Sequence, residues 1–222
     1  MTSELVRDWF PQGEVASARR MRKHALAADL RALIADVLLL DVENADERAL
    51  AEAEGLLARA RSAVSALPDV RASGGLYGTG GDAGLFERSP LSGRCNALAA
   101  PLSISFDGVL TLGHAVYGDA YEGPPGSVHG GYVIAAFDDL MGVAQAASGT
   151  AGFTGTLSVR LVGRTPLHRQ IDYAAGVTAV DGRKVTTWGR STLDGEVLAE
   201  ATGIFVQPRG GVGIPAVDEP SS

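Results

Sequence analysis

Hydrophobic and polar positions follow different patterns in the two halves of the chain. In the first half, apolar residues recur at steps of three and four, which is the period of a helix, and they predict helices over residues 14–40 and 44–67. From residue 102 onward, apolar and polar residues alternate over several short runs, which is typical of half-buried strands. The sequence therefore predicts a helical region that precedes a sheet.

The two N-terminal helices are expected to form an antiparallel hairpin. Residues 44–47 have the pattern of a capping box that opens the second helix, and Pro68 ends it. The apolar residues of the second helix form a narrow packing seam of Leu50, Ala53, Leu57, Ala60, Val64 and Leu67. Two helices cannot bury such a seam alone, so we expect the hairpin to cover the main domain or a neighbouring subunit.

The second half predicts one long helix within a series of strands. The helix covers residues 132–147 and is apolar nearly all the way round, which predicts that it is buried. Strands are expected at residues 102–106, 109–117, 154–162, 169–180, 183–193 and 197–206. Asp-Gly pairs at 181–182 and 194–195 are hairpin turn signals, and consecutive strands joined in this way form an antiparallel meander. The predicted fold class is α+β, with one helix packed on one antiparallel sheet.

Composition separates the main domain from the segments around it. We expect a helical extension at residues 1–70, a glycine-rich linker at 71–100, the main domain at 101–208 and a loose tail at 209–222. The glycines of the linker do not have the pattern of a nucleotide-binding loop, because no strand precedes them and no Gly-Lys-Ser/Thr follows.

Charge, cysteine content and hydropathy exclude several classes of protein. The chain has 222 residues and a net charge of −7, whereas a general nucleic-acid-binding protein is usually basic. Cys95 is the single cysteine, so neither an internal disulfide nor a cysteine-rich metal motif is expected. The first residues lack an apolar signal core, and no run approaches the ~18–20 apolar residues of a membrane span. We therefore expect a cytoplasmic protein with no membrane span.

A loop rich in proline and glycine, residues 122–131, leads into the predicted buried helix. It ends in His129, Gly130 and Gly131. Proline fixes φ and glycine admits conformations closed to other residues, so the path of the loop is tightly specified. Helix N-termini carry unpaired N–H groups and a partial positive charge. This junction therefore predicts a site for a carbonyl oxygen that becomes negative during a reaction.

Two consecutive acids, Asp138 and Asp139, lie within the apolar helix. Successive helical residues point roughly 100° apart, so the two side chains cannot share one environment. A carboxylate among apolar residues is unfavourable unless it is paired or used in chemistry. Periodicity does not choose between these acids, and an acid satisfied by a neighbouring side chain is the alternative to a catalytic one.

The loop and the acid after it resemble a known family. The stretch from Tyr121 to Gly131, followed by an acid nine residues after the histidine (138 − 129 = 9), is similar to the hotdog-fold acyl-CoA thioesterases of the PaaI type. The similarity continues through Thr154 and residues 164–167, and it covers roughly residues 101–206. The resemblance implies a hotdog fold and the hydrolysis of an acyl-CoA thioester to free acid and CoA, without a cofactor.

The resemblance also implies roles for individual residues. It places the catalytic acid at Asp138, either as a base that deprotonates water or as a nucleophile that attacks the carbonyl. Gly130 and Gly131 supply the oxyanion site. His129 lies near the thioester carbonyl or supports the loop, and Thr154 matches the family's threonine that holds the attacking water.

Further residues are candidates for substrate binding. Tyr132, Phe137 and Met141 are candidates for lining the acyl site, with ordinary core packing as the alternative. Arg160, Arg164 and Arg169 are candidates for the nucleotide of CoA, with solvated surface charges as the alternative. His114 and His168 have no partners at metal-ligand spacing, so no metal is expected.

The spacing of the site residues predicts an oligomer. Nine residues of helix rise roughly 13–14 Å, so Asp138 is too far from the Gly130 amide to act on the same carbonyl within one helix. Two such helices that lie antiparallel across a two-fold axis would bring the glycine of one subunit to the aspartate of the other. We therefore expect an obligate homodimer with shared sites, and the resemblance adds tetramers built from such dimers.

Two other functions stay open at this point. One is a hotdog hydratase or dehydratase that acts on acyl thioesters, although the Asp/His pattern usual for that class is not seen. The other is a non-catalytic acyl-CoA-binding or interaction module, with the helical hairpin as its docking surface.

Overall fold

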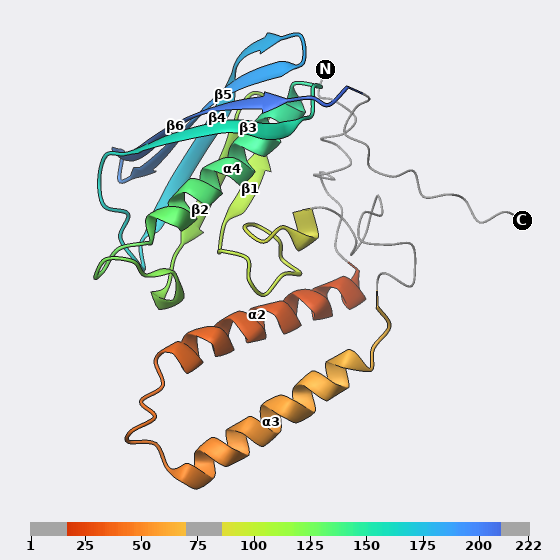
Figure 1. Ribbon diagram of the computed structural model, residues 1–222, viewed down its shortest axis with the longest axis vertical. Helices are drawn as coiled ribbons and strands as arrows, with labels where there is room; N and C mark the ends of the chain where they lie inside the picture. Colours follow the sequence, from red (N-terminus) through yellow and green to blue (C-terminus); the bar gives the residue numbers. More distant parts are fainter. Residues whose placement is uncertain (1–16, 70–85, 210–222) are drawn as a thin grey trace, which may run out of the picture.

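The computed structural model of the chain describes residues 17–69 and 86–209 (Figure 1). The N-terminal part consists of helices α2 (Ala18–Leu38) and α3 (Glu47–Ser65), followed by the 3-10 turn η3 (Phe86–Arg88). The second half contains the 3-10 turn η4 (Asp119–Tyr121) and the long helix α4 (Gly130–Ala147). Its strands are β1 (Ser103–Phe106), β2 (Thr111–Val116), β3 (Phe153–Leu161), β4 (Gln170–Asp181), β5 (Lys184–Leu193) and β6 (Glu196–Val206).

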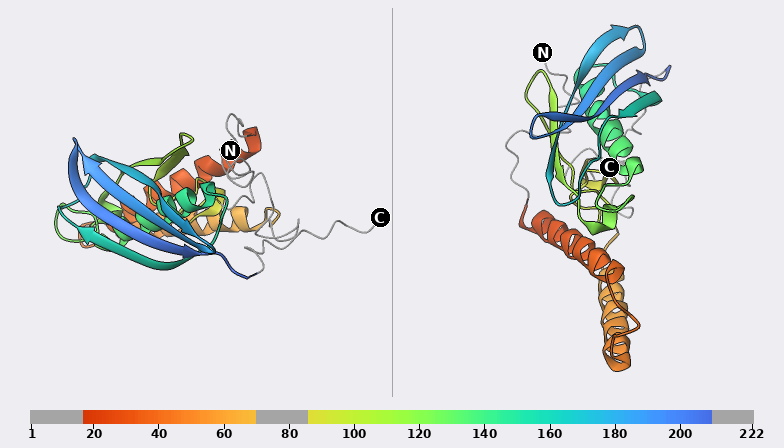
Figure 2. Two further views of the ribbon diagram at one scale, coloured as in Figure 1. Left: turned by 90° about the horizontal axis from the view of Figure 1, so that it is seen from above. Right: turned by 90° about the vertical axis from the view of Figure 1, so that its left-hand side faces the viewer.

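The strands form one antiparallel sheet in the order β1-β2-β4-β5-β6-β3. The sheet curls around α4, which lies along its inner face (Figures 1 and 2). Although β3 follows α4 directly in the chain, it joins the sheet at the far edge beside β6. One helix wrapped by one antiparallel sheet is the hotdog arrangement, which confirms the predicted fold class.

The core lies between α4 and the sheet. Val133, Phe137, Leu140 and Met141 on α4 are at most 2% exposed. They face buried strand residues that include Ile171, Ala175, Val185 and Phe205. Full burial of one such large apolar side chain stabilises a fold by about 1.5–3 kcal/mol. The apolar helix predicted from the sequence is therefore the central element of the core.

The start of α3 differs from the predicted capping box. The N-cap is Asp46, whose carboxylate accepts a hydrogen bond from the Ala49 amide at 2.9 Å. Asn44 instead donates its side-chain amide to Asp41 at 2.6 Å. Asn and Asp are equally good N-caps, so the choice depends on the path of the chain before the helix rather than on residue type.

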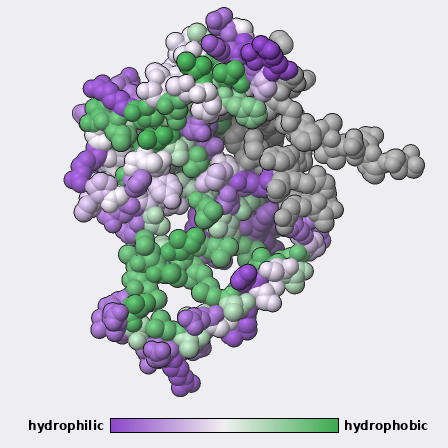
Figure 3. Space-filling view, viewed as in Figure 1, coloured by the Kyte–Doolittle hydropathy of each residue, from purple (hydrophilic) through white to green (hydrophobic). Residues whose placement is uncertain are grey.

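The helical extension contacts the sheet domain mainly through α2. His24 and Ala27 are buried, and Arg31 donates to the backbone oxygen of Asn96 at 2.8 Å. In contrast, α3 contains no buried residue, so the predicted seam along it is not packed within this chain. Helices α2 and α3 run roughly antiparallel (Figure 1) and leave apolar surface exposed (Figure 3), with contributions from Leu26, Leu30, Ile34, Leu56, Leu57 and Val64.

Parts of the predicted domain division lie outside the described residues. These are residues 1–16 and 70 of the helical extension, residues 71–85 of the linker and residues 210–222 of the tail. The boundaries at residues 70, 100 and 208 stay predictions. Within the described ranges, no helix has both the length and the apolar character that crossing a bilayer would require.

Candidate active site

The loop before α4 is held by hydrogen bonds on both of its sides. Within the loop, the Glu122 carboxylate accepts a bond from the Gly126 amide at 2.7 Å. Outside it, the Val128 amide donates to the backbone oxygen of Thr165 at 2.8 Å, and the loop forms an isolated β-bridge to residue 166. These bonds fix the position from which His129 enters the helix.

His129 is the N-cap of α4. Its Nδ1 accepts a hydrogen bond from the amide of Gly131 at 3.0 Å. A nitrogen that accepts a bond carries no proton, so in the neutral imidazole the proton lies on Nε2. The side chain is exposed, and Nε2–H is therefore available as a donor to a ligand. His129 can therefore support the loop through Nδ1 and contact a ligand through Nε2 at the same time.

The two glycines differ in what their amides do. The Gly131 amide is used by the His129 cap. Among the described residues, the Gly130 amide has no hydrogen-bond acceptor. As the first residue of α4, Gly130 also lies at the positive end of the helix dipole. Gly130 is therefore the donor that this junction leaves open to a ligand.

Asp138 and Thr154 lie together. The hydroxyl of Thr154, near the start of β3, donates to Oδ1 of Asp138 on α4 at 2.8 Å. Asp138 is half-buried and Thr154 is exposed. This bond fixes one carboxylate oxygen, and the hydroxyl of the exposed Thr154 can still accept a hydrogen bond.

Asp139 has a different environment, as the helical geometry predicts. Its Oδ2 accepts hydrogen bonds from the hydroxyls of Ser89 at 3.0 Å and Ser92 at 2.5 Å. Burial raises the pKa of the Asp139 carboxyl above its ordinary value of 3.8, although the two serine bonds lower it, and the charge of Asp138 raises it further. Asp139 is thus the acid satisfied by neighbouring side chains, whereas Asp138 faces Thr154.

The sequence did not predict the turn of residues 89–93, here called the serine turn, whose Ser89 and Ser92 hold Asp139. Ser89 also accepts bonds from the amides of Leu91 and Ser92, which closes a tight turn. A Cβ at Gly93 would lie 2.5 Å from the Ser89 backbone oxygen, so the turn requires glycine there. Serines and a glycine at this spacing indicate a turn, but nothing local shows that the turn meets a residue about fifty positions away.

The burial of the Asp139 carboxyl leads to a prediction about pH. The folded state binds the Asp139 proton more tightly than the unfolded state, because burial raises the pKa. Between the unfolded value of 3.8 and the folded value, the contribution of Asp139 to the free energy of unfolding therefore falls as pH rises, by at most about 1.4 kcal/mol per pH unit. Asp139→Asn removes this ionisation, and its amide oxygen can still accept from both serines because both bonds go to one oxygen.

Urea unfolding of wild type and Asp139→Asn at a series of pH values tests this expectation. The variant should gain stability relative to wild type as pH rises from below 3.8, and the difference should then level off. A difference that is constant with pH, or that grows in favour of wild type, would contradict the assignment.

The predicted substrate-binding residues fall into different environments. Tyr132 is 36% exposed and packs edge-to-face on Tyr121, with ring centroids 4.9 Å apart. Phe137 and Met141 are fully buried in the core. Arg164 donates to the backbone oxygen of Pro125 at 3.2 Å, which places it beside the loop that carries His129.

The other two arginines form exposed ion pairs. Arg160 on β3 pairs with Glu200 at 3.5 Å, and Arg169 pairs with Asp194 at 2.7 Å. Exposed pairs of this kind contribute little to stability. The structure thus brings Tyr132 to the helix start and Arg164 to the loop, whereas Phe137 and Met141 lie in the core and Arg160 and Arg169 pair with carboxylates.

Comparison with known proteins places the chain in a family. No family model and no curated protein matches it. The crystal structure of a thioesterase superfamily protein is 30% identical, with a TM-score of 0.70, and the match covers 83% of this chain and 94% of that one. The chain therefore belongs to the thioesterase superfamily.

Two further solved structures match a smaller part of the chain. A phenylacetic acid degradation-related protein from Ralstonia eutropha JMP134 is 22% identical, with a TM-score of 0.43, over 47% of this chain and 83% of that one. The protein smu.793 from Streptococcus mutans UA159, bound to acetyl CoA, is 18% identical, with a TM-score of 0.45, over 48% of this chain and 88% of that one.

Proposed function

We propose that the protein hydrolyses an acyl-CoA thioester to a free acid and CoA. Membership of the thioesterase superfamily supports thioester chemistry in general. The observation that carries the proposal is that α4 has an open amide donor at Gly130 and a carboxylate, Asp138, fixed by Thr154. An oxyanion donor and a base or nucleophile are the two elements that this reaction needs.

The start of α4 is assigned to the thioester carbonyl. The Gly130 amide donates to the carbonyl oxygen, whose negative charge grows as the tetrahedral intermediate forms. Loss of one such donor typically raises the barrier by ~3 kcal/mol. The exposed Nε2–H of His129 is a second donor at the same helix start.

Asp138 is assigned to the attack on the carbonyl carbon. As a base, it takes a proton from a water molecule whose oxygen attacks that carbon. The carbon–sulfur bond then breaks, and the CoA thiolate leaves and takes up a proton. The Thr154 hydroxyl donates to Asp138 and can accept from the water, so it orients both. Attack by Asp138 itself, followed by hydrolysis of an anhydride, is equally compatible with this geometry.

Both groups cannot serve one carbonyl within a single chain. Gly130 and Asp138 lie on the same helix, and eight steps (138 − 130 = 8) rise about 12 Å. A carbonyl that accepts a bond from the Gly130 amide is therefore out of reach of Asp138 in the same copy. This distance supports a site shared between two copies of the chain.

The position of β3 supports the same arrangement. Among the described strands, β3 pairs only with β6, and its nine residues are mostly exposed. Near the first end of β3, Thr154 forms a hydrogen bond with Asp138. At the other end, Leu161 lies beside Gly130, because a Cβ added to Gly130 would be 3.3 Å from the Leu161 side chain. A long unpaired edge is a template for another strand.

Antiparallel pairing of β3 with β3 of a second copy would join the two halves of the site. If the pairing is centred near residue 157, Phe153 faces Leu161 of the second copy. The Asp138 end of each copy then lies beside the Gly130 end of the other. Phe153 and Leu161 are 65% and 50% exposed in the single chain, and both would gain cover from the second copy. We propose a homodimer on these grounds; its pairing into tetramers stays a prediction.

Thiol release over a panel of acyl-CoA substrates, together with light scattering, tests the proposed function. We expect stoichiometric free CoA and acid from at least one substrate, and the mass of a dimer or of a tetramer built from dimers. Hydration of an enoyl-CoA without free thiol would favour the hydratase. Tight acyl-CoA binding without turnover would favour the binding module, and a fully active monomer would overturn the shared site.

A further inference from the structure

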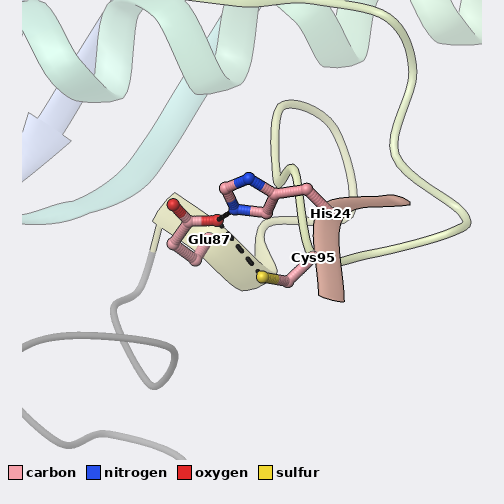
Figure 4. Close-up of side chains that lie close together, drawn as sticks. All are labelled: His24, Glu87 and Cys95. Carbon is pink, nitrogen blue, oxygen red and sulfur yellow. Dashed lines mark hydrogen bonds and ion pairs between the residues drawn. The ribbon is translucent and has the colours of Figure 1, made fainter. Parts of the chain in front are cut away.

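A mixed cluster of His24, Glu87 and Cys95 contains none of the residues assigned to thioester hydrolysis (Figure 4). His24 comes from α2, Glu87 from η3 and Cys95 from the loop that follows η3. His24 Nε2 is 2.7 Å from Oε2 of Glu87, and Cys95 Sγ is 3.2 Å from the same oxygen. The three ligand atoms all lie within 4.8 Å of one another.

The chemistry of this cluster matches one class of metal ion. Imidazole nitrogen, thiolate sulfur and carboxylate oxygen are the donors that Zn²⁺ uses in proteins, whereas Mg²⁺ and Ca²⁺ prefer oxygen alone. We propose that His24, Glu87 and Cys95 form a zinc-binding site, with water in the fourth position. The proposal is independent of the proposed hydrolysis, because the cluster contains none of the residues assigned to it.

His24 is nearly buried, so its contact with Glu87 is not a surface ion pair. The residue is 9% exposed. Its other ring nitrogen, Nδ1, is buried and has no hydrogen-bond partner among the described residues. The polar contact of this nearly buried ring is therefore directed into the cluster, towards a carboxylate oxygen that a thiol also contacts (Figure 4).

The geometry requires only a small expansion to hold the ion. In a tetrahedral zinc site, ligand atoms about 2.0–2.3 Å from the metal are roughly 3.3–3.6 Å from one another. The present nitrogen–oxygen and sulfur–oxygen separations are 2.7 and 3.2 Å. An outward shift of the half-buried Glu87 side chain by a few tenths of an ångström would open the centre. Zinc would then replace the thiol proton and the proton shared between imidazole and carboxylate.

A metal at this position would connect the helical extension to the sheet domain. His24 belongs to α2, whereas Glu87 and Cys95 flank the serine turn that holds Asp139 on α4. Zinc would therefore clamp α2 onto that turn. Because the ligands are separated by 63 and 8 positions in the chain, binding would also depend on the folded state.

Zinc titration of the full-length protein after chelator treatment tests the site. We expect one zinc per chain, and a melting temperature that rises when zinc is added. With Co²⁺ as the probe, we expect the near-ultraviolet charge-transfer absorption of a cobalt–thiolate bond. Cys95→Ser should abolish this absorption. Mutation of residues that only support the metal ligands typically weakens metal binding by roughly 10–100-fold. Both Cys95→Ser and Glu87→Gln remove a ligand, so each should weaken zinc binding by at least that factor.

His168→Asn is the matched control. This histidine is exposed and contacts Asp119 at 2.9 Å, outside the cluster, and its positive φ suits asparagine. It should leave zinc stoichiometry and affinity unchanged. The proposal would be overturned if the wild-type protein bound less than one zinc per chain, or if it bound zinc but showed no cobalt–thiolate absorption with Co²⁺. It would also be overturned if Cys95→Ser and Glu87→Gln, shown by circular dichroism to be folded, bound zinc with the same affinity as wild type.

Discussion

Replacement of Asp138 by asparagine is expected to lower the turnover of acyl-CoA by roughly 10²–10⁴-fold, which is the usual contribution of a positioned base. Asparagine has nearly the same shape and can still accept the Thr154 hydrogen bond through its amide oxygen. It can neither take a proton from water nor attack a carbonyl. Thiol-release kinetics under saturating substrate, with circular dichroism and light scattering as checks on the fold and the dimer, measure the effect.

Asp139→Asn is the matched control for this experiment. It removes a carboxylate from the neighbouring position of the same helix, but that carboxylate is bonded to Ser89 and Ser92. We expect its turnover to stay close to that of wild type. Unchanged turnover in Asp138→Asn would remove Asp138 from the mechanism, and a loss confined to Asp139→Asn would assign the chemistry to the other acid.

Removal of the Gly130 amide is expected to lower turnover by roughly 10²–10³-fold, as the loss of an oxyanion donor does. Gly130→Pro removes this N–H at the first position of α4, where proline is favoured. His129, with φ −59° and ψ 129°, already has a conformation that suits a residue before proline. Gly130→Ala is the control, because it keeps the amide and adds only a Cβ, 3.3 Å from Leu161.

The same variant tests whether the site is shared between two copies. A heterodimer of Asp138→Asn with Gly130→Pro would contain one site with both changes and one site with neither. Random exchange makes half of the dimers heterodimers, so an equal mixture of the two nearly inactive proteins should recover about a quarter of wild-type turnover. No recovery in heterodimers isolated with two different tags would place both groups of the site in one chain.

Much of the fold was predictable because the second half of the chain is locally consistent. Alternation of apolar and polar residues defined each strand to within a few residues, and the Asp-Gly turns linked β4, β5 and β6. The apolar run after Gly131 could only be a buried helix. The order of the strands in the sheet, with β3 at the edge, follows from the way the sheet closes around α4 and is not encoded in any single segment.

The candidate site was predictable only where its residues lie within one segment. The junction from His129 to Gly131 and the acid at position 138 share a loop and a helix, so their spacing has meaning. The separate environments of Asp138 and Asp139 followed from helix geometry, but their partners did not. Thr154 was identified through a family resemblance, and the serines that hold Asp139 lie 47 and 50 positions away.

The helical extension shows the limit of periodicity as a guide. The steps of three and four along α3 do form a helix, but none of its side chains is buried in this chain. Periodicity reports that a face is apolar and does not report what covers it. The residues of the proposed zinc site illustrate the same limit, because a histidine 63 positions from its carboxylate partner has no local signature.

The few residues that join the extension to the sheet domain have a consequence for how the molecule unfolds. Cooperative unfolding depends on buried surface that two parts of a protein share. Because α3 contains no buried residue and α2 buries only His24 and Ala27, we expect the extension to behave as a separate foldon with a low opening free energy. We then expect thermal fluctuations to open the extension while α4 stays within the sheet, and the bond between Thr154 and Asp138, which involves no residue of the extension, to persist.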